Sequence, residues 1–150
     1  MRVEHTTYME APPEVVWAVT EDVERWPEWT PTVTSVRREG GDPFGLGSVA
    51  WIKQPLQPES RWVVTDYQRG RRFAWETRRA GLRMTGAHEL SAEGTGTRNR
   101  LSVDAEGPLA VLFWPVLRLA MKRALADENH GLRVRCEQRA ATHSSQPDAP

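Results

Sequence analysis

Apolar and polar residues alternate with a period of two through most of the stretch from Thr32 to Ala105. In residues 82–90, leucine, methionine, glycine, histidine and leucine occupy every second position, with arginine, threonine, alanine and glutamate between them. This period is typical of strands that bury one face. Short glycine-containing turns, such as Gln68–Gly70 and Glu93–Gly96, separate the alternating runs. Because such short connections join antiparallel neighbours, the pattern predicts an antiparallel meander.

Helical patterns flank this region on both sides. A first strand is predicted over Val3–Met9, followed by two short helices within residues 11–26. After the meander, Gly107 opens a long helix to about Gln138, whose apolar residues recur at steps of three and four. One strand, two helices, six strands and a long helix make an α+β plan. Because strands twist, the sheet should curve around the long helix and leave a hollow between them.

The length of 150 residues suits one domain. We predict that residues 1–139 form it and that residues 140–150, which are small, polar and proline-containing, form a disordered tail. The N-terminus has no apolar signal-peptide core. The longest apolar run, Leu109 to Leu117, is well short of the ~20 residues of a membrane-spanning helix. We therefore expect a cytoplasmic protein without membrane insertion.

The charge balance argues against whole classes of partner. Lys and Arg together number 20, as do Asp and Glu, so the formal net charge is zero. Such a chain has no electrostatic footprint for nucleic acid and no general attraction to anionic membranes. The single cysteine, Cys136, cannot form an intramolecular disulfide, and its place on the apolar stripe of the long helix predicts a small buried hydrophobe.

The order of elements, with particular residues in place, resembles the START-like, or SRPBCC, superfamily, and within it the bacterial polyketide cyclase/dehydrase-like proteins. The resemblance spans about residues 2–138 and rests on an ordered set of short segments: Ala11–Trp17, Asp22–Trp29, Gly45–Ala50, Arg71–Glu76, Gly107–Ala110 and Glu128–Leu132. It implies a helix-grip fold of the Bet v 1 kind, with about seven strands around the C-terminal helix. Members of the superfamily share a pocket but differ in use, so the resemblance implies a cavity rather than a reaction.

Metal and cofactor chemistry has little support in the sequence. The histidines are His5, His88, His130 and His143, and no two of them stand four residues apart on one helix. No Cys-x-x-Cys pair is present. The ring-hydroxylase branch of the superfamily would require two histidines and a carboxylate around iron. We predict no metal site and no cofactor.

General acid–base chemistry is the one catalytic option that the residues leave open. His88 shares a strand face with Met84 and Leu90, so it should point inward, and Glu128 interrupts the apolar stripe of the long helix. Either group could move a proton next to a carbonyl. The competing interpretations are a hydrogen-bonded core histidine for His88, which we favour, and a salt bridge or an exposed position for Glu128.

Seven tryptophans are several times the usual number for a chain of this length. They either fill a large core or line a cavity, which we expect to measure roughly 300–1,000 Å³. Trp26 and Trp29 flank Pro27 at a helix–strand junction and could form a lid or seal the edge of the core. The predicted ligand-binding residues are Trp26, Trp29, Trp51, Trp62, Trp75, Met84, His88, Phe113, Leu117 and Met121.

Three interpretations of function follow from the sequence. The first is a binding protein for a hydrophobic small molecule, which would be polyketide-, aromatic- or lipid-like. The second is a polyketide cyclase or dehydratase that uses acid–base catalysis without metal or cofactor. The third is an interaction protein, which predicts a filled core or an exposed apolar patch. A homodimer is compatible with each of them.

Overall fold

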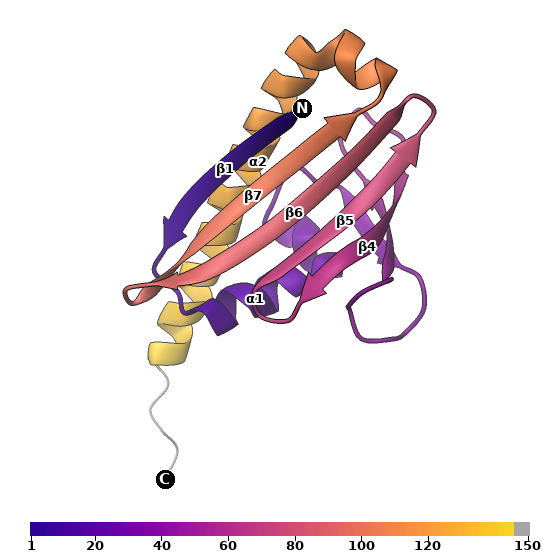
Figure 1. The fold of residues 1–150 in the computed structure, drawn as a ribbon. Coiled ribbons are helices and arrows are strands. Elements are labelled where there is room, and N and C mark those ends of the chain that lie inside the picture. Colours follow the sequence, from indigo (N-terminus) through magenta and orange to yellow (C-terminus); the bar gives the residue numbers. More distant parts are fainter. Residues whose placement is uncertain (146–150) are drawn as a thin grey trace.

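The computed structural model describes residues 1–145 as one curved sheet gripping one long helix (Figure 1). The chain starts with β1 (Arg2–Met9), followed by the helix α1 (Pro13–Glu21) and a 3₁₀ helix, η1 (Val23–Glu28). Six strands and the long helix then complete the domain: β2 (Ser35–Arg38), β3 (Val49–Lys53), β4 (Ser60–Gln68), β5 (Arg72–Arg79), β6 (Leu82–Glu93), β7 (Gly96–Glu106) and α2 (Pro108–Ser144). The predicted helix-grip fold is confirmed.

The sheet follows the predicted meander. Its spatial order is β1-β7-β6-β5-β4-β3-β2, and every neighbouring pair is antiparallel. β6 and β7 are the longest strands and are joined by a tight turn containing Gly94, which adopts a positive φ of 59°. β1 pairs with β7, so β1 and β2 form the two edges of the sheet.

The helix α2 crosses the concave face of this sheet. Pro115 lies inside α2, and Figure 1 shows the helix bending after its first turns. A proline within a helix removes one backbone hydrogen bond and favours such a bend. Farther along, a Cβ on Gly131 would overlap the carbonyl oxygen of Trp29, so the lack of a side chain there lets the end of η1 pack directly against α2.

The C-terminal end of α2 differs from the prediction. The helix continues to Ser144, beyond the expected boundary at residue 139, and Ala140 packs against the core. Alanine is a strong helix former, and the small, polar composition hid this extension of the helix. The rest of the predicted tail, residues 146–150, lies outside the described residues. None of the helices within residues 1–145 is long and apolar enough to span a membrane.

Candidate functional site

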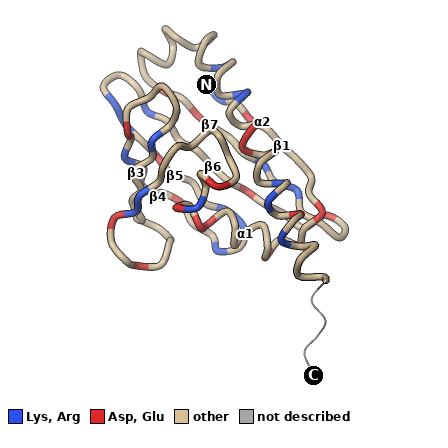
Figure 2. The backbone as a smooth tube through the Cα atoms, turned by 180° about the vertical axis from the view of Figure 1, so that it is seen from behind, with Lys and Arg blue, Asp and Glu red and all other residues tan. Residues whose placement is uncertain are grey.

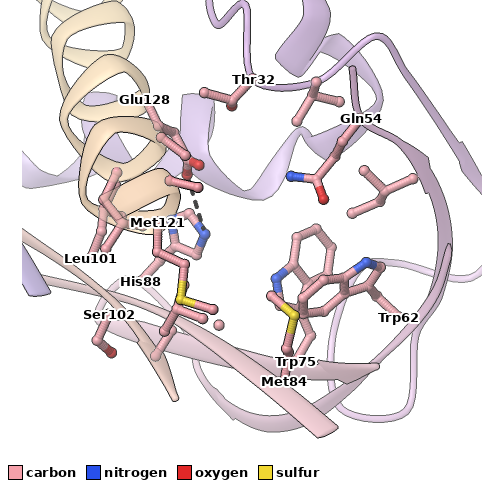
Figure 3. Close-up of a pocket in the computed structure, with 18 of the residues that line it drawn as sticks. Thr32, Gln54, Trp62, Trp75, Met84, His88, Leu101, Ser102, Met121 and Glu128 are labelled. Atoms are coloured by element: carbon pink, nitrogen blue, oxygen red, sulfur yellow. Dashed lines mark ion pairs between the residues drawn. The ribbon is translucent and has the colours of Figure 1, made fainter. Parts of the chain in front are cut away.

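A cavity of about 240 Å³ lies between the concave face of the sheet and α2 (Figure 3). The sheet contributes Trp62 from β4, Trp75 from β5 and Met84 from β6, and the helix contributes Leu117 and Met121. The volume falls below the range of ~300–1,000 Å³ that we expected for a ligand site. The cavity nevertheless shows that the tryptophans do not fill the interior completely.

Most of the residues predicted to bind a ligand lie on the wall of this cavity: Trp26, Trp62, Trp75, Met84, His88, Leu117 and Met121. Glu128, the second proposed proton-transfer group, also lies there. Their positions follow from the two periodicities that the sequence displays, since alternate residues of a strand and every third or fourth residue of a helix share a face. Their role toward a ligand stays a prediction.

Trp51 was placed wrongly, because it lies on the convex side of the sheet. In β3, Ala50 and Ile52 are the buried residues, so the alternation turns Trp51 outward. Its indole N–H donates a hydrogen bond to the Glu39 carboxylate at 2.7 Å, and the guanidinium of Arg37 lies 5.8 Å from the ring centre. Apolar residues on both faces of this short strand concealed the orientation.

Phe113 and Trp29 also lie off the cavity wall. Phe113 precedes Leu117 by four residues and would share its face in a straight helix, but Pro115 lies between them, and Phe113 is 52% exposed. Trp29 is half-buried at the end of η1, with its ring centre 5.6 Å from that of Trp26. It therefore packs behind the residue that faces the cavity.

His88 is held in the floor of the cavity by aromatic rings on two elements. Its cross-strand neighbour on β5 is Phe73, whose ring stacks on the imidazole with the ring centres 4.7 Å apart. The ring of Trp26, from η1, has its centre 4.9 Å from that of the imidazole. Burial among these rings disfavours the charged imidazolium and lowers the pKa of His88 to about 3.

Glu128 faces His88 from the helix. Its Oε1 lies 3.6 Å from Nε2 of His88, as the dashed line in Figure 3 marks. Burial disfavours the carboxylate and raises the pKa of Glu128 to about 8. At neutral pH the pair therefore consists of a protonated carboxyl group and a neutral imidazole. The separation exceeds hydrogen-bond length, so the acid O–H can donate to another acceptor in the cavity.

The aromatic side of the cavity depends on a glycine in the neighbouring strand. Gly86 on β6 pairs with Trp75 on β5, and a Cβ at Gly86 would lie 3.3 Å from the Trp75 indole nitrogen. The missing side chain lets that indole lie across the strand, and Figure 3 shows its nitrogen pointing into the cavity. The ring centre of Trp62 lies 5.7 Å from that of Trp75. A ligand would meet two indole rings on this side.

Sequence reasoning missed several residues of the wall. Gln54 and Gln57 come from the loop between β3 and β4, and Thr32 precedes β2. Loop residues have no periodicity that could place them. Ala124 could have been found, because it lies three residues after Met121 and four before Glu128 on the same side of α2.

Two further kinds of chemistry, metal binding and catalysis by a thiolate, can be assessed in residues 1–145. Within residues 1–145, no group of three or more histidine, cysteine, aspartate or glutamate side chains gathers closely enough to hold a metal ion. Cys136 is fully buried in the core, and burial raises the pKa of its thiol to about 12. The thiolate, which is the nucleophilic form of cysteine, is therefore scarce at neutral pH.

Solved structures share this fold at low sequence identity. One is StfQ, a di-domain aromatase/cyclase from the steffimycin biosynthetic pathway, with a TM-score of 0.76 and 14% identity over 93% of this chain. The match covers 51% of StfQ, so the chain spans about half of that protein. Another is TTHA0849 from Thermus thermophilus, with a TM-score of 0.73 and 21% identity over 97% of this chain and 100% of that one.

A plant protein belongs to the same structural group. The major latex-like protein 151 of Panax ginseng has a TM-score of 0.70 and 10% identity, over 91% of this chain and 97% of that one. Identities this low show a shared fold only. No curated protein matches the sequence.

The family relationship rests on the sequence itself. A family model described as polyketide cyclase/dehydrase and lipid transport matches residues 1–137, which is nearly all of the described chain. The matched region runs from β1 through most of α2 and so includes every residue of the cavity wall. The chain belongs to the polyketide cyclase/dehydrase and lipid transport family, as its resemblance to START-like proteins predicted.

Proposed function

We propose that the protein binds a compact, ring-containing hydrophobic molecule in the cavity between the sheet and α2. The observation that carries this proposal is the wall, in which three indole rings and aliphatic side chains surround a small number of polar groups. Apolar walls with a few directed polar groups are the usual form of a ligand site. A cavity of about 240 Å³ favours a small aromatic or polyketide-like molecule over a long acyl chain.

The family and its structural relatives support a ligand of this kind. The family description covers polyketide cyclisation or dehydration and lipid transport, all of which act on largely apolar molecules. StfQ is named as an aromatase/cyclase, and the present fold resembles it. The cytoplasmic location is a prediction from the sequence alone.

Filling the cavity tests this proposal. Ala124 lies on the cavity wall, so the larger side chain of Ala124→Phe would occupy ligand space. The matched control is Ala141→Phe, an exposed position on the same helix. Binding of the neutral fluorescent probe N-phenyl-1-naphthylamine should weaken at least about tenfold in Ala124→Phe, equivalent to about 1.4 kcal/mol, and stay unchanged in the control. Equal probe affinity in folded Ala124→Phe would remove the cavity as the binding site.

A second candidate function is cyclisation or dehydration of a poly-β-keto compound. The His88–Glu128 pair favours it, because a neutral imidazole and a protonated carboxyl group face each other across 3.6 Å. His88 could take a proton from the carbon between two carbonyls. The resulting carbanion would attack the carbon of a third carbonyl group while Glu128 protonates the oxygen of that group. This forms a carbon–carbon bond and a hydroxyl, and loss of that hydroxyl as water would complete a dehydration.

His88→Gln and Glu128→Gln separate the enzyme from the binding protein. If the pair transfers protons, turnover of a poly-β-keto thioester mimic should fall about 10²–10⁴-fold in each variant, the usual contribution of a positioned proton-transfer group. Affinity for the naphthylamine probe should change little, because the apolar wall is intact. Full turnover by both folded variants would leave the reaction without its proposed proton-transfer groups.

A further inference from the structure

The first half of α2 exposes a run of large apolar side chains that nothing in the described chain covers. Leu112, Val116 and Leu119 are between 69% and 72% exposed. Their spacing of four and three residues places them on one side of the helix, opposite the side that contributes Leu117 and Met121 to the cavity. We call Leu112, Val116 and Leu119 the outer stripe. Isolated exposed leucines are ordinary, but a contiguous apolar patch marks an interaction surface.

All charged side chains among residues 107–126 are basic. Arg118, Lys122 and Arg123 follow in the next turns, and residues 107–126 contain no aspartate or glutamate. Figure 2 shows the same order along α2, with uncharged first turns, then blue, then red farther down the helix. Within residues 1–145, none of the three basic residues forms an ion pair. The zero net charge of the whole chain therefore conceals a locally cationic, apolar segment.

The cavity lies beside the same part of the molecule. Leu117, Ala120, Met121 and Ala124 line it from the inner side of the helical segment that carries the outer stripe. The loop between β3 and β4 also lines it, through Gln54 and Gln57. A surface that binds the outer stripe would therefore lie close to the cavity.

The β3–β4 loop lies at the same end of the sheet as the start of α2, and it exposes a leucine of its own. The Arg79 guanidinium donates hydrogen bonds to the carbonyls of Pro58 and Glu59 at 2.9 and 3.2 Å. Just beyond Arg79, the backbone N–H of Leu109 donates to the Gly81 carbonyl at 3.0 Å. These bonds join the loop, the β5–β6 turn and the helix start. Leu56, at the tip of the loop, is completely exposed.

We propose that the outer stripe docks on the surface of an anionic lipid membrane. A helix segment with leucine, valine and aromatic side chains and adjacent lysine and arginine is suited to lie in the plane of the lipid headgroups. The apolar side chains enter the acyl boundary, and Arg118, Lys122 and Arg123 contact anionic headgroups. In this arrangement α2 lies in the plane of the headgroups, and docking turns the cavity end of the domain toward the lipid.

A second copy of the chain fits the outer stripe less well than a lipid surface does. In a two-fold symmetric dimer the stripe would meet itself, which brings the same residues of both copies together. Arg118, Lys122 and Arg123 would then face their own counterparts, with no carboxylate in residues 107–126 to neutralise them. Juxtaposed like charges oppose association. An anionic membrane supplies the missing negative charge.

Docking also suggests that an apolar ligand would enter the cavity from the membrane. This inference about the ligand rests on the proposed function. A molecule that partitions into lipid could pass from the membrane to the cavity without crossing bulk water. The two proposals can fail separately. Ala124→Phe fills the cavity from the inner side of α2, so it should weaken probe binding and leave vesicle binding unchanged. Substitutions in the outer stripe should do the reverse.

Sedimentation with lipid vesicles tests the docking. We expect the wild-type protein to bind phosphatidylcholine vesicles that contain phosphatidylglycerol, to bind pure phosphatidylcholine vesicles weakly, and to lose affinity as salt is added. Leu112→Glu combined with Leu119→Glu should weaken binding at least about tenfold. Neutralising Arg118, Lys122 and Arg123 to glutamine should also weaken it at least about tenfold, since each basic residue near an anionic surface contributes about fivefold.

The matched control is Leu46→Glu, because Leu46 is 71% exposed in the loop between β2 and β3, outside the outer stripe. It should bind vesicles as the wild type does. All these substitutions are at exposed positions, so circular dichroism should show an unchanged fold. The proposal is overturned if wild-type protein stays in solution with phosphatidylglycerol vesicles or if Leu46→Glu impairs binding as much as the stripe variant. It is equally overturned if light scattering shows a dimer that the stripe variant abolishes, since a second copy would then cover the face.

Discussion

Replacing Glu128 with glutamine removes a carboxyl group that titrates far from its usual range, and the effect on stability can be worked out. The pKa of Glu128 is about 8 in the folded protein, compared with about 4.3 in an unfolded chain. Between these pH values the folded state holds a proton that the unfolded state has released. The stabilisation by this group is therefore complete below pH ~4.3 and is lost as the pH rises to ~8, by up to about 1.4 kcal/mol per pH unit.

His88 acts with the opposite sign over a lower range. Its pKa is about 3 in the folded protein and about 6.5 in an unfolded chain, so between these values the unfolded state binds the extra proton. Its contribution to stability consequently rises with pH until ~6.5. From pH ~4.3 to ~6.5 the two slopes cancel. Above pH ~6.5 the Glu128 slope outweighs that of His88, and integrating both titrations to pH ~8 gives a net loss of about 1.3 kcal/mol.

Urea unfolding followed by tryptophan fluorescence measures this difference. The free energy of unfolding of the wild type should fall by about 1.3 kcal/mol between pH 6.5 and pH 8, and that of Glu128→Gln should change by less than about 0.5 kcal/mol over the same interval. The control is Glu137→Gln, on the same helix, where the carboxylate bonds to Arg133 at the surface at 3.0 Å. This variant should keep the wild-type decline.

Two results would refute the reasoning. If wild-type stability is constant from pH 6.5 to 8, the buried pair does not retain a proton. If Glu128→Gln keeps the decline, another group carries it. The pH profile counts protons and does not say which partner of the pair holds one, because a neutral pair and an ion pair contain the same number. Infrared spectroscopy decides this, since only the neutral pair has the carbonyl stretch of a protonated carboxyl group, which Glu128→Gln would remove.

Two further substitutions and one truncation test how α2 is held. Gly131→Ala should destabilise the protein by about 2 kcal/mol or more, because a Cβ there would overlap the backbone at the end of η1, whereas Gly41→Ala, with open space around it, should stay within ~0.5 kcal/mol in urea unfolding. Asn129→Ala should cost about 3 kcal/mol by the same assay, because the buried amide bonds to the Asn99 side chain on β7 and to the side chain and backbone carbonyl of His5 on β1. Ending the chain after Arg139 should lower the melting temperature measurably, since it removes Ala140 from the core, and an unchanged melting temperature would restore the tail boundary that the sequence suggested.

The sequence predicts the fold well because the two longest strands, β6 and β7, each have only one apolar face. In β6, the alternation from Leu82 to Leu90 could be satisfied in one way, and it correctly turned His88 toward the helix. β3 was less informative, since Val49, Ala50, Trp51 and Ile52 are all apolar and the pattern fits either orientation. Alanine and isoleucine, rather than tryptophan, turned inward there. Alternation predicts a strand's orientation only when its two faces differ in polarity.

The cavity was harder to predict than the fold, because its dimensions depend on positions that no local pattern encodes. The bend at Pro115 moved Phe113 away from a face that a straight helix would have given it. Gly86 has no side chain, and the space beside it is occupied by the Trp75 indole. The loop residue Gln54 reaches the wall through tertiary contacts alone. These features depend on how elements distant in sequence pack together, and the range of ~300–1,000 Å³ expected from the sequence was therefore too large.

The helix α2 has separate surfaces for the two proposed activities. Its inner side carries Met121 and Glu128, which contact the cavity, and its outer side carries Leu112 and Leu119, which are largely exposed. A helix allows this separation because residues three or four apart share a face and those two apart do not. A change in the polarity of the outer stripe therefore leaves the cavity wall intact. A protein that takes apolar ligands from a membrane needs this arrangement, since its docking surface must be apolar when the cavity is empty and when it is filled.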